Sequence, residues 1–185
     1  MAKKLSHSVS TSTTVRIPNH IYDIIEFEAS SNDSTVSTVI NNILRKHASW
    51  DRFVGDIGFM YVQKPLVRAL FEKVSSKDLS KMSDTIGYAR IRDAVLFIDG
   101  KVDVTGITYV IKLWLTTSNI PIRVIETDES IEFIVKHNLG NKWSVYFSTI
   151  LKKLFAELKI TSIEEDIEDH TVEITFGLKS KKKKK

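Results

Sequence analysis

Residues 13–50 read TTVRIPNHIYDIIEFEASSNDSTVSTVINNILRKHASW, and this stretch decides how the rest of the chain is interpreted. Residues 13–17 alternate β-branched and long side chains, a pattern that favours a strand. Pro18 follows them; it has no backbone N–H to donate to a β-ladder, and it suits the first turn of a helix. The stretch therefore predicts a short strand that leads directly into a helix.

Two short helices are predicted after this strand. Apolar side chains at helical spacing mark the first helix, at Ile21, Ile24, Ile25 and Ala29. Residues 30–33 then interrupt it with turn-forming side chains. Thr35 is a good N-cap for the second helix, whose last turn carries the cations that a helix C-terminus prefers. The inward positions of the second helix are Val36, Val39, Ile40, Ile43 and Leu44.

So small a unit hides too little apolar surface to offset its chain entropy, so it should dimerise. The order and spacing of several short motifs resemble those of the ribbon-helix-helix family of DNA-binding proteins (the Arc/MetJ type). The resemblance covers about the first quarter of the chain. Asp33 stands where many family members have glycine, although Asn32 and Asp33 both tolerate a left-handed backbone. The matching motifs are Thr14-Val15-Arg16-Ile17-Pro18, Tyr22-Asp23-Ile24-Ile25, Ala29, Thr35-Val36-Ser37, Val39-Ile40 and Ile43-Leu44.

The resemblance implies a β-α-α module in which the strands of two chains pair into an antiparallel ribbon. The resulting intertwined dimer would place this ribbon in the major groove of double-stranded DNA. With Val15 and Ile17 inward, the outward side chains that would contact base edges are Ser12, Thr14 and Arg16. The start of the second helix would hold a DNA phosphate through Thr35, Val36 and Ser37. The alternative is that residues 13–50 are an ordinary amphipathic part of a larger core.

The chain has 185 residues, of which 42% are hydrophobic, so it can hold this module and a second folded domain. It has no cysteine, which excludes disulfides and thiolate metal sites. No apolar run approaches the ~18 residues of a membrane span, and residues 1–14 lack a signal peptide's apolar stretch. We therefore expect a cytoplasmic protein without a membrane contact.

Charge is distributed unevenly along the chain. The formal net charge is +4, but Lys179 and Lys181–Lys185 contribute six positive charges, so the remainder carries −2. We expect residues 179–185 to be a disordered tail that can also bind polyanions such as DNA non-specifically. Residues 1–11 are predicted to be a flexible arm, and the ribbon-helix-helix module then occupies 12–54.

Residues 59–178 are predicted to form an α+β domain in which helices cover an antiparallel sheet. Helices are expected after Pro65, from about Ser76, and over 105–117, although 95–98 could equally be a short strand. A hairpin with its turn at Asp128-Glu129, a long helix over 141–159 and a final strand around Ile174 follow. The acidic residues at 164–169 are predicted to be a solvated loop.

Residues 137–146, HNLGNKWSVY, are loosely similar to vinyl-reductase-type small-molecule-binding domains. His137 is interpreted as a satisfied structural histidine rather than as a ligand or base, and the aromatic stripe that follows as core. We find no phosphate-loop motif, no nucleophile elbow and no histidine pair at zinc spacing, so the sequence predicts neither an enzyme nor a cofactor or metal site.

These observations predict a dimeric, sequence-specific DNA-binding transcriptional regulator that can assemble further on DNA. Its C-terminal domain would have a regulatory or assembly role. One alternative is an antitoxin-like repressor whose C-terminal domain captures a partner protein. Another is a small-molecule-binding or enzymatic C-terminal domain, with an N-terminal element that serves only for dimerisation.

Overall fold

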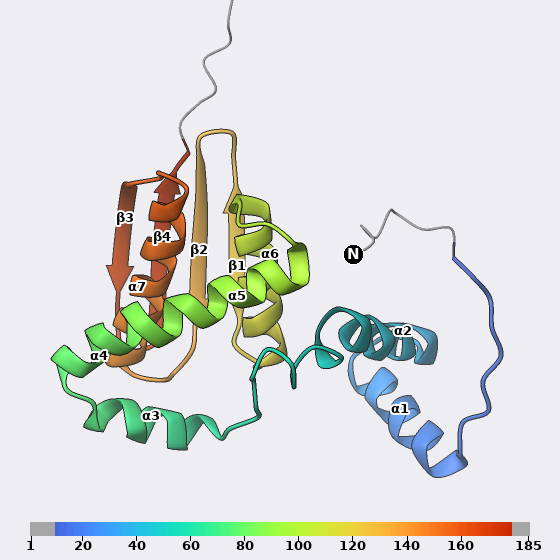
Figure 1. Ribbon diagram of the computed structural model, residues 1–185. Coiled ribbons are helices and arrows are strands. Elements are labelled where there is room, and N and C mark those ends of the chain that lie inside the picture. Colours follow the sequence, from blue (N-terminus) through green and yellow to red (C-terminus); the bar gives the residue numbers. More distant parts are fainter. Residues whose placement is uncertain (1–9, 179–185) are drawn as a thin grey trace, which may run out of the picture. The chain divides into compact units, whose positions relative to one another are not determined.

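The computed structural model describes residues 10–178. These residues fall into two compact units, with the boundary between Phe53 and Val54 (Figure 1), and each unit is described by itself. Most of the predicted arm 1–11 and all of the predicted tail 179–185 lie outside the described residues.

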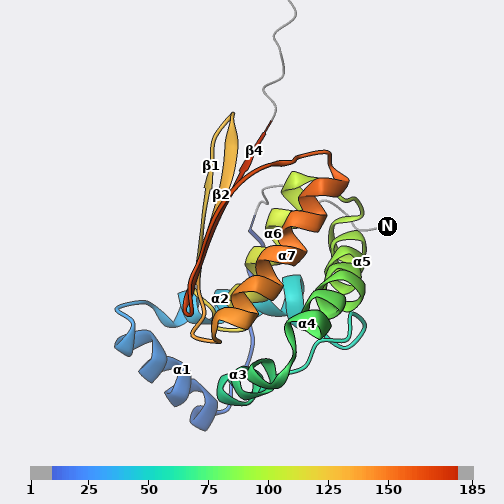
Figure 2. The ribbon, with the colours of Figure 1, turned by 90° about the vertical axis from the view of Figure 1, so that its left-hand side faces the viewer.

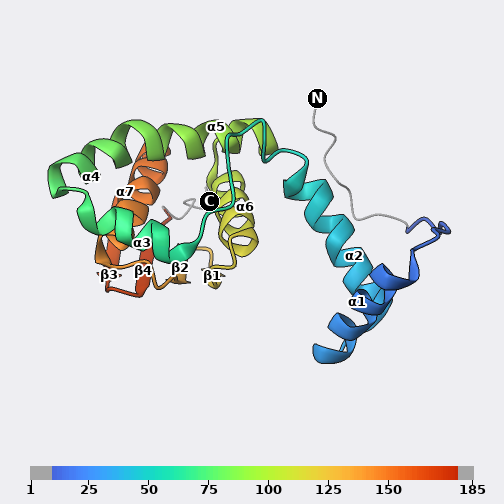
Figure 3. The same ribbon diagram turned by 90° about the horizontal axis from the view of Figure 1, so that it is seen from below.

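The N-terminal unit is a pair of helices, as the apolar spacing predicts. Helix α1 spans Asn19–Ser31, and helix α2 spans Val36–Lys46 and continues into the π-turn η1, His47–Asp51 (Figure 3). Asp33 takes the left-handed conformation, with φ of 47°, so the turn forms without a glycine. The hydroxyl of Thr35 accepts a hydrogen bond from the backbone N–H of Thr38 at 3.2 Å, which confirms Thr35 as the N-cap of α2.

The strand predicted at 13–17 is not a strand in the single chain, where residues 10–18 have no regular secondary structure. A β-ladder needs a partner backbone, and no other described segment pairs with these residues. Pairing with a second copy remains a prediction. The chain enters α1 through Pro18, whose carbonyl accepts the first helical hydrogen bonds from Ile21 and Tyr22.

The C-terminal unit begins with helices, followed by two hairpins that flank a long helix. A single helical rod runs from Ser76 to Asp99 with a π-turn inside it, so the helical interpretation of 95–98 is confirmed and the strand alternative is wrong. Ser75 caps this rod, one residue before the predicted start. The elements are α3 (Lys64–Lys73), α4 (Ser76–Met82), η2 (Ser83–Gly87), α5 (Tyr88–Asp99), α6 (Val104–Thr117), β1 (Ile122–Glu126), β2 (Ser130–Lys136), α7 (Asn141–Glu157), β3 (Ser162–Ile167) and β4 (Thr171–Gly177).

The strands form one antiparallel sheet in the order β1-β2-β4-β3. Phe133 of β2 lies opposite Val124 of β1 and Ile174 of β4, so alternate residues of each strand share one face. Helices α6 and α7 cover that face, and α5 packs on these two helices on their side away from the sheet (Figure 2). The predicted α+β arrangement of the C-terminal part is therefore confirmed.

Strand β3 corrects one prediction, because the acidic segment at 164–169 is mostly strand rather than loop. Residues Ser162–Ile167 pair with β4 in a continuous register from Ser162 opposite Gly177 to Ile167 opposite Val172. The strand lies at the sheet edge, where charged side chains are exposed and block pairing with other chains. Glu165 accepts hydrogen bonds from Ser148 at 2.5 Å and Lys152 at 2.8 Å, which joins β3 to α7.

The core lies between the sheet and α7. Phe147 and Phe155 of α7 are fully buried, and Phe155 stacks on Phe176 of β4 with 3.9 Å between ring centroids. Trp143 stacks on Phe147 at 5.1 Å, so the aromatic stripe of α7 is core, as predicted. Among residues 10–178, no helix is both long and apolar enough to cross a membrane.

Candidate nucleic-acid interface

The segment before α1 carries the residues that the family resemblance assigns to base contacts. The side chains of Ser12, Thr14 and Arg16 are all exposed. Val15, which was expected to point inward, is 70% exposed, whereas Ile17 is half-buried. The inward position of Val15 refers to the ribbon of two chains and stays a prediction, because a residue on an unpaired segment has no partner surface to cover it.

The start of α2 provides hydrogen-bond donors. Thr35 and Ser37 are exposed and Val36 is half-buried. The hydroxyl of Thr35 already caps Thr38 and lies 2.9 Å from the Thr38 hydroxyl. The first backbone N–H groups of a helix have no partner within it, and the first turn of α2 holds no acidic residue. This helix end therefore suits an anion such as a phosphate.

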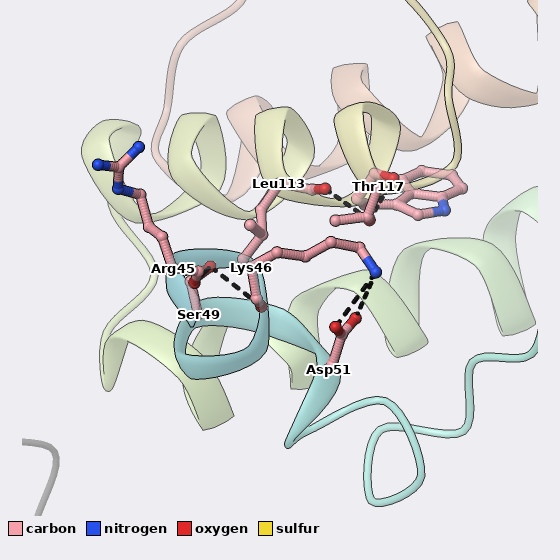
Figure 4. A network of polar contacts seen from close by, with 7 residues as sticks. Arg45, Lys46, Ser49, Asp51, Leu113 and Thr117 are labelled. Atoms are coloured by element: carbon pink, nitrogen blue, oxygen red, sulfur yellow. Dashed lines mark hydrogen bonds and ion pairs between the residues drawn. The ribbon is translucent and has the colours of Figure 1, made fainter. Parts of the chain in front are cut away.

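The end of α2 is held by polar contacts within the N-terminal unit (Figure 4). Ser49 donates a hydrogen bond to the backbone carbonyl of Arg45 at 2.7 Å. Lys46 contacts both carboxylate oxygens of Asp51, at 2.9 and 3.1 Å. The ion pair ties the last turn of α2 to the end of the π-turn, while the Arg45 side chain remains exposed.

The helix pair buries little apolar surface in one chain. Its buried cluster consists of Ile25, Ala29 and Val39, with Val36 and Ile40 partly covered. Ile43 and Leu44 were predicted to point inward but are exposed, because a two-helix hairpin covers only one side of each helix. Phe27, which stands between Glu26 and Glu28 in the sequence, was not among the predicted residues and is 75% exposed. The large apolar side chains left exposed on this unit are Val15, Ile21, Tyr22, Ile24, Phe27, Ile43 and Leu44.

The C-terminal unit contains a buried Ser–His contact that resembles part of a catalytic triad. Nε2 of His137 lies 2.9 Å from the hydroxyl of Ser144, and its Nδ1 accepts a hydrogen bond from the backbone N–H of Leu139 at 2.9 Å. Because Nδ1 accepts, the proton of the neutral ring is on Nε2, which donates to Ser144. The Ser144 hydroxyl in turn donates to the carbonyl of Glu168 at 2.6 Å.

This arrangement cannot activate Ser144, because the ring offers it a proton instead of a lone pair. Burial lowers the pKa of His137 from 6.5 to about 4, so the ring stays neutral at physiological pH. The geometry matches the interpretation of His137 as a structural residue. In the described part of the chain, no group of three or more His, Asp or Glu side chains is placed to hold a metal ion.

Comparison with protein-family models and with curated proteins found no match to the chain.

Proposed function

We propose that the protein is a cytoplasmic, dimeric, sequence-specific DNA-binding regulator that reads double-stranded DNA through residues 12–54. The observation that carries this proposal is the uncovered apolar surface of the N-terminal helix pair, which lies directly after an unpaired segment bearing Arg16. A second copy would cover Val15 and the exposed helix faces, and it would supply the partner strand that residues 13–17 lack. The ribbon-helix-helix arrangement would provide both the cover for the apolar faces and the partner strand.

In this proposal, the paired segments 13–17 of two chains lie in the major groove, and the N-terminus of each α2 helix contacts a phosphate. Arg16 has the fork of donors that contacts guanine at O6 and N7, while the hydroxyls of Ser12 and Thr14 are permissive partners for several bases. Thr35, Val36 and Ser37 would fix the register on the backbone through the N-terminus of α2.

Charge gives the arm and the tail a role in the same proposal. Residues 19–53 carry five acidic residues and three basic ones, so the net charge of the helices does not attract DNA. The positive charge lies outside them, at Lys3, Lys4 and Arg16 and in the six lysines of 179–185. Lysines of this kind release counterions on meeting phosphates and strengthen binding to every sequence alike.

One titration tests the base contact. DNA selected in vitro for binding and a scrambled control are titrated with the full-length protein at several salt concentrations. Arg16→Ala should cost specific binding about 1–3 kcal/mol and relax the preference at one position of each half-site. Arg45→Ala, which removes an equal charge from the exposed end of α2, is the matched control and should affect both DNAs alike.

Deleting Lys181–Lys185 in the same titration should give the opposite signature. Both DNAs should weaken equally, and the salt dependence should flatten by about 0.9 for each phosphate that the lysines no longer neutralise. If Arg16→Ala weakens selected and scrambled DNA to the same extent, the segment does not read bases and the proposal fails.

A further inference from the structure

The C-terminal unit has a groove that the proposed DNA contacts do not use. It lies between α6 and β1 and has a volume of about 420 Å³, within the range of about 300–1,000 Å³ that holds small organic ligands. One wall is the outer face of α6, and the other includes the last residue of β1. The groove is lined by Thr105, Thr108, Tyr109, Lys112, Leu113, Thr116 and Glu126.

We propose that this groove binds a small zwitterion, a molecule about the size of one substituted aromatic ring that carries an ammonium and a carboxylate group. Lys112 and Glu126 stand on the two elements that form the groove, and both are exposed. Neither makes an ion pair with the other or with any residue among 10–178. A ligand carboxylate would pair with Lys112, and a ligand ammonium with Glu126.

These two groups differ from the charged residues of the unit that pair with each other. Arg92 is paired with Glu157 at 2.9 Å, and Lys152 with Glu165 at 2.8 Å. The Lys112 nitrogen and the Glu126 carboxylate oxygens are more than 4.0 Å apart, on the two sides of one groove. This separation leaves room for a ligand that contacts both. Charge-assisted hydrogen bonds of this kind are about twice as strong as neutral ones.

The remaining walls suit a flat apolar body between the two charges. Tyr109 is 41% exposed and Leu113 is half-buried, so both offer apolar surface to a ligand. Thr108 is buried in the lining, and its hydroxyl already donates to the carbonyl of Val104 at 2.7 Å, which leaves its methyl group for contact. Thr105 and Thr116 are exposed along the same helix face.

The groove is also preformed, which limits the entropy lost on binding. The opposite face of α6 is fixed in the core by Ile107, Val110 and Leu115, all fully buried. Glu126 is held in the sheet opposite Ile131 of β2. Both walls therefore belong to packed elements of the fold.

The test uses the full-length protein and two aromatic zwitterions, 4-(aminomethyl)benzoate, with its charges at opposite ends, and L-phenylalanine, with adjacent charges. Each is compared by calorimetry with analogues that lack one charge: 4-ethylbenzoate and 4-methylbenzylamine for the first, 3-phenylpropionate and phenethylamine for the second. At least one zwitterion should bind about tenfold or more tightly than both of its analogues.

Two variants assign the charges to their partners. Lys112→Gln should remove the preference for the zwitterion over the amine analogue, and Glu126→Gln the preference over the carboxylate analogue. Lys77→Gln and Glu173→Gln, which neutralise exposed residues outside the groove, are the matched controls and should change neither preference. Because Lys112 and Glu126 are exposed and unpaired, their variants should fold, and circular dichroism checks this.

The proposal is overturned if neither zwitterion is preferred over its analogues, or if the preference survives both variants. DNA plays no part in this experiment, so its result is separate from that of the proposed function.

Discussion

The side chain of His137 joins three parts of the C-terminal unit at a single residue. It follows strand β2, contacts Ser144 of α7, and through that hydroxyl reaches the carbonyl of Glu168 after β3. Its ring also lies 4.3 Å from that of Trp143, and its backbone N–H donates to the carbonyl of His170. Protonation of Nδ1 would break the bond from Leu139, so the neutral ring is needed for the whole set of contacts.

The free energy of unfolding should therefore depend on pH through this residue. Because burial lowers the pKa of His137 from 6.5 to about 4, its contribution is complete above pH 6.5 and is lost as the pH falls toward 4. The slope should reach at most about 1.4 kcal/mol per pH unit. Urea unfolding of the full-length protein between pH 5 and pH 8 measures it.

His137→Gln should flatten this slope, whatever its stability at high pH, while His170→Gln, which removes an exposed histidine, should keep most of it. The pKa values of Asp103 and Glu157 are lowered by hydrogen bonds from cationic side chains. These carboxylates therefore lose their contributions to the free energy of unfolding at a lower pH than His137 does. An unchanged slope in His137→Gln would show that another group titrates in this range.

At the level of elements, the π-turn η2 determines how closely the rod from Ser76 to Asp99 approaches α7. Gly87 ends this turn, and a Cβ atom there would lie 2.5 Å from Cδ1 of Ile150 and 2.6 Å from the hydroxyl oxygen of Tyr146. Its φ of −59° is an ordinary helical value, so glycine is required by space and not by conformation. Ile150 is fully buried and cannot move aside easily.

Gly87→Ala should therefore destabilise the protein by about 1–3 kcal/mol. Helix propensity alone would favour alanine by about 1 kcal/mol, so the predicted sign depends on the contact with α7. Gly55→Ala is the matched control, since nothing lies within 4 Å of its added Cβ. Equilibrium unfolding followed by circular dichroism measures both, and a stabilised Gly87→Ala would contradict the packing described.

Apolar periodicity predicted the helices and strands that bury one face. It did not predict strand β3, which has no fully buried residue. The helix predicted over 105–117 has its apolar side chains on one stripe; four of them are buried and Trp114 is partly buried. The five are Ile107, Val110, Ile111, Trp114 and Leu115. Strand β3 has only Ile163 and Ile167 partly covered, so its acidic sequence shows no alternation. The strand at 13–17 is absent from the single chain for a different reason, since its ladder would need a second chain.

The groove on α6 was beyond sequence reasoning for a physical reason. Its residues lie on the polar side of a helix that the apolar pattern assigns to solvent, and its other charged group, Glu126, comes from a different element. Nothing in their spacing indicates that Lys112 and Glu126 share one groove. In contrast, the cap at Thr35 and the turn at Asp33 were predictable, because each depends on local backbone chemistry.

At the scale of the whole molecule, the two units differ in how much of their apolar surface one chain can cover. The C-terminal unit buries a continuous core from Ile91 to Phe176, so a partner is not needed for it to fold. This distinguishes it from the partner-capturing segment of an antitoxin-like repressor, which is commonly disordered when free. The N-terminal unit has a buried cluster of only three residues, so in the proposed function a second copy completes it.

Assembly should therefore respond to substitutions in the N-terminal unit alone. We expect the full-length protein to sediment as a dimer at micromolar concentration. Ile24→Glu should shift it to monomer, because Ile24 is 64% exposed in the single chain and would be buried between copies. Ile86→Glu is the matched control: Ile86 is 57% exposed on the C-terminal unit, and its replacement should leave the dimer intact. Sedimentation equilibrium measures both masses. A monomeric parent protein, or a dimer that persists in Ile24→Glu and dissociates in Ile86→Glu, would remove the N-terminal helix pair as the assembly element and the paired ribbon with it.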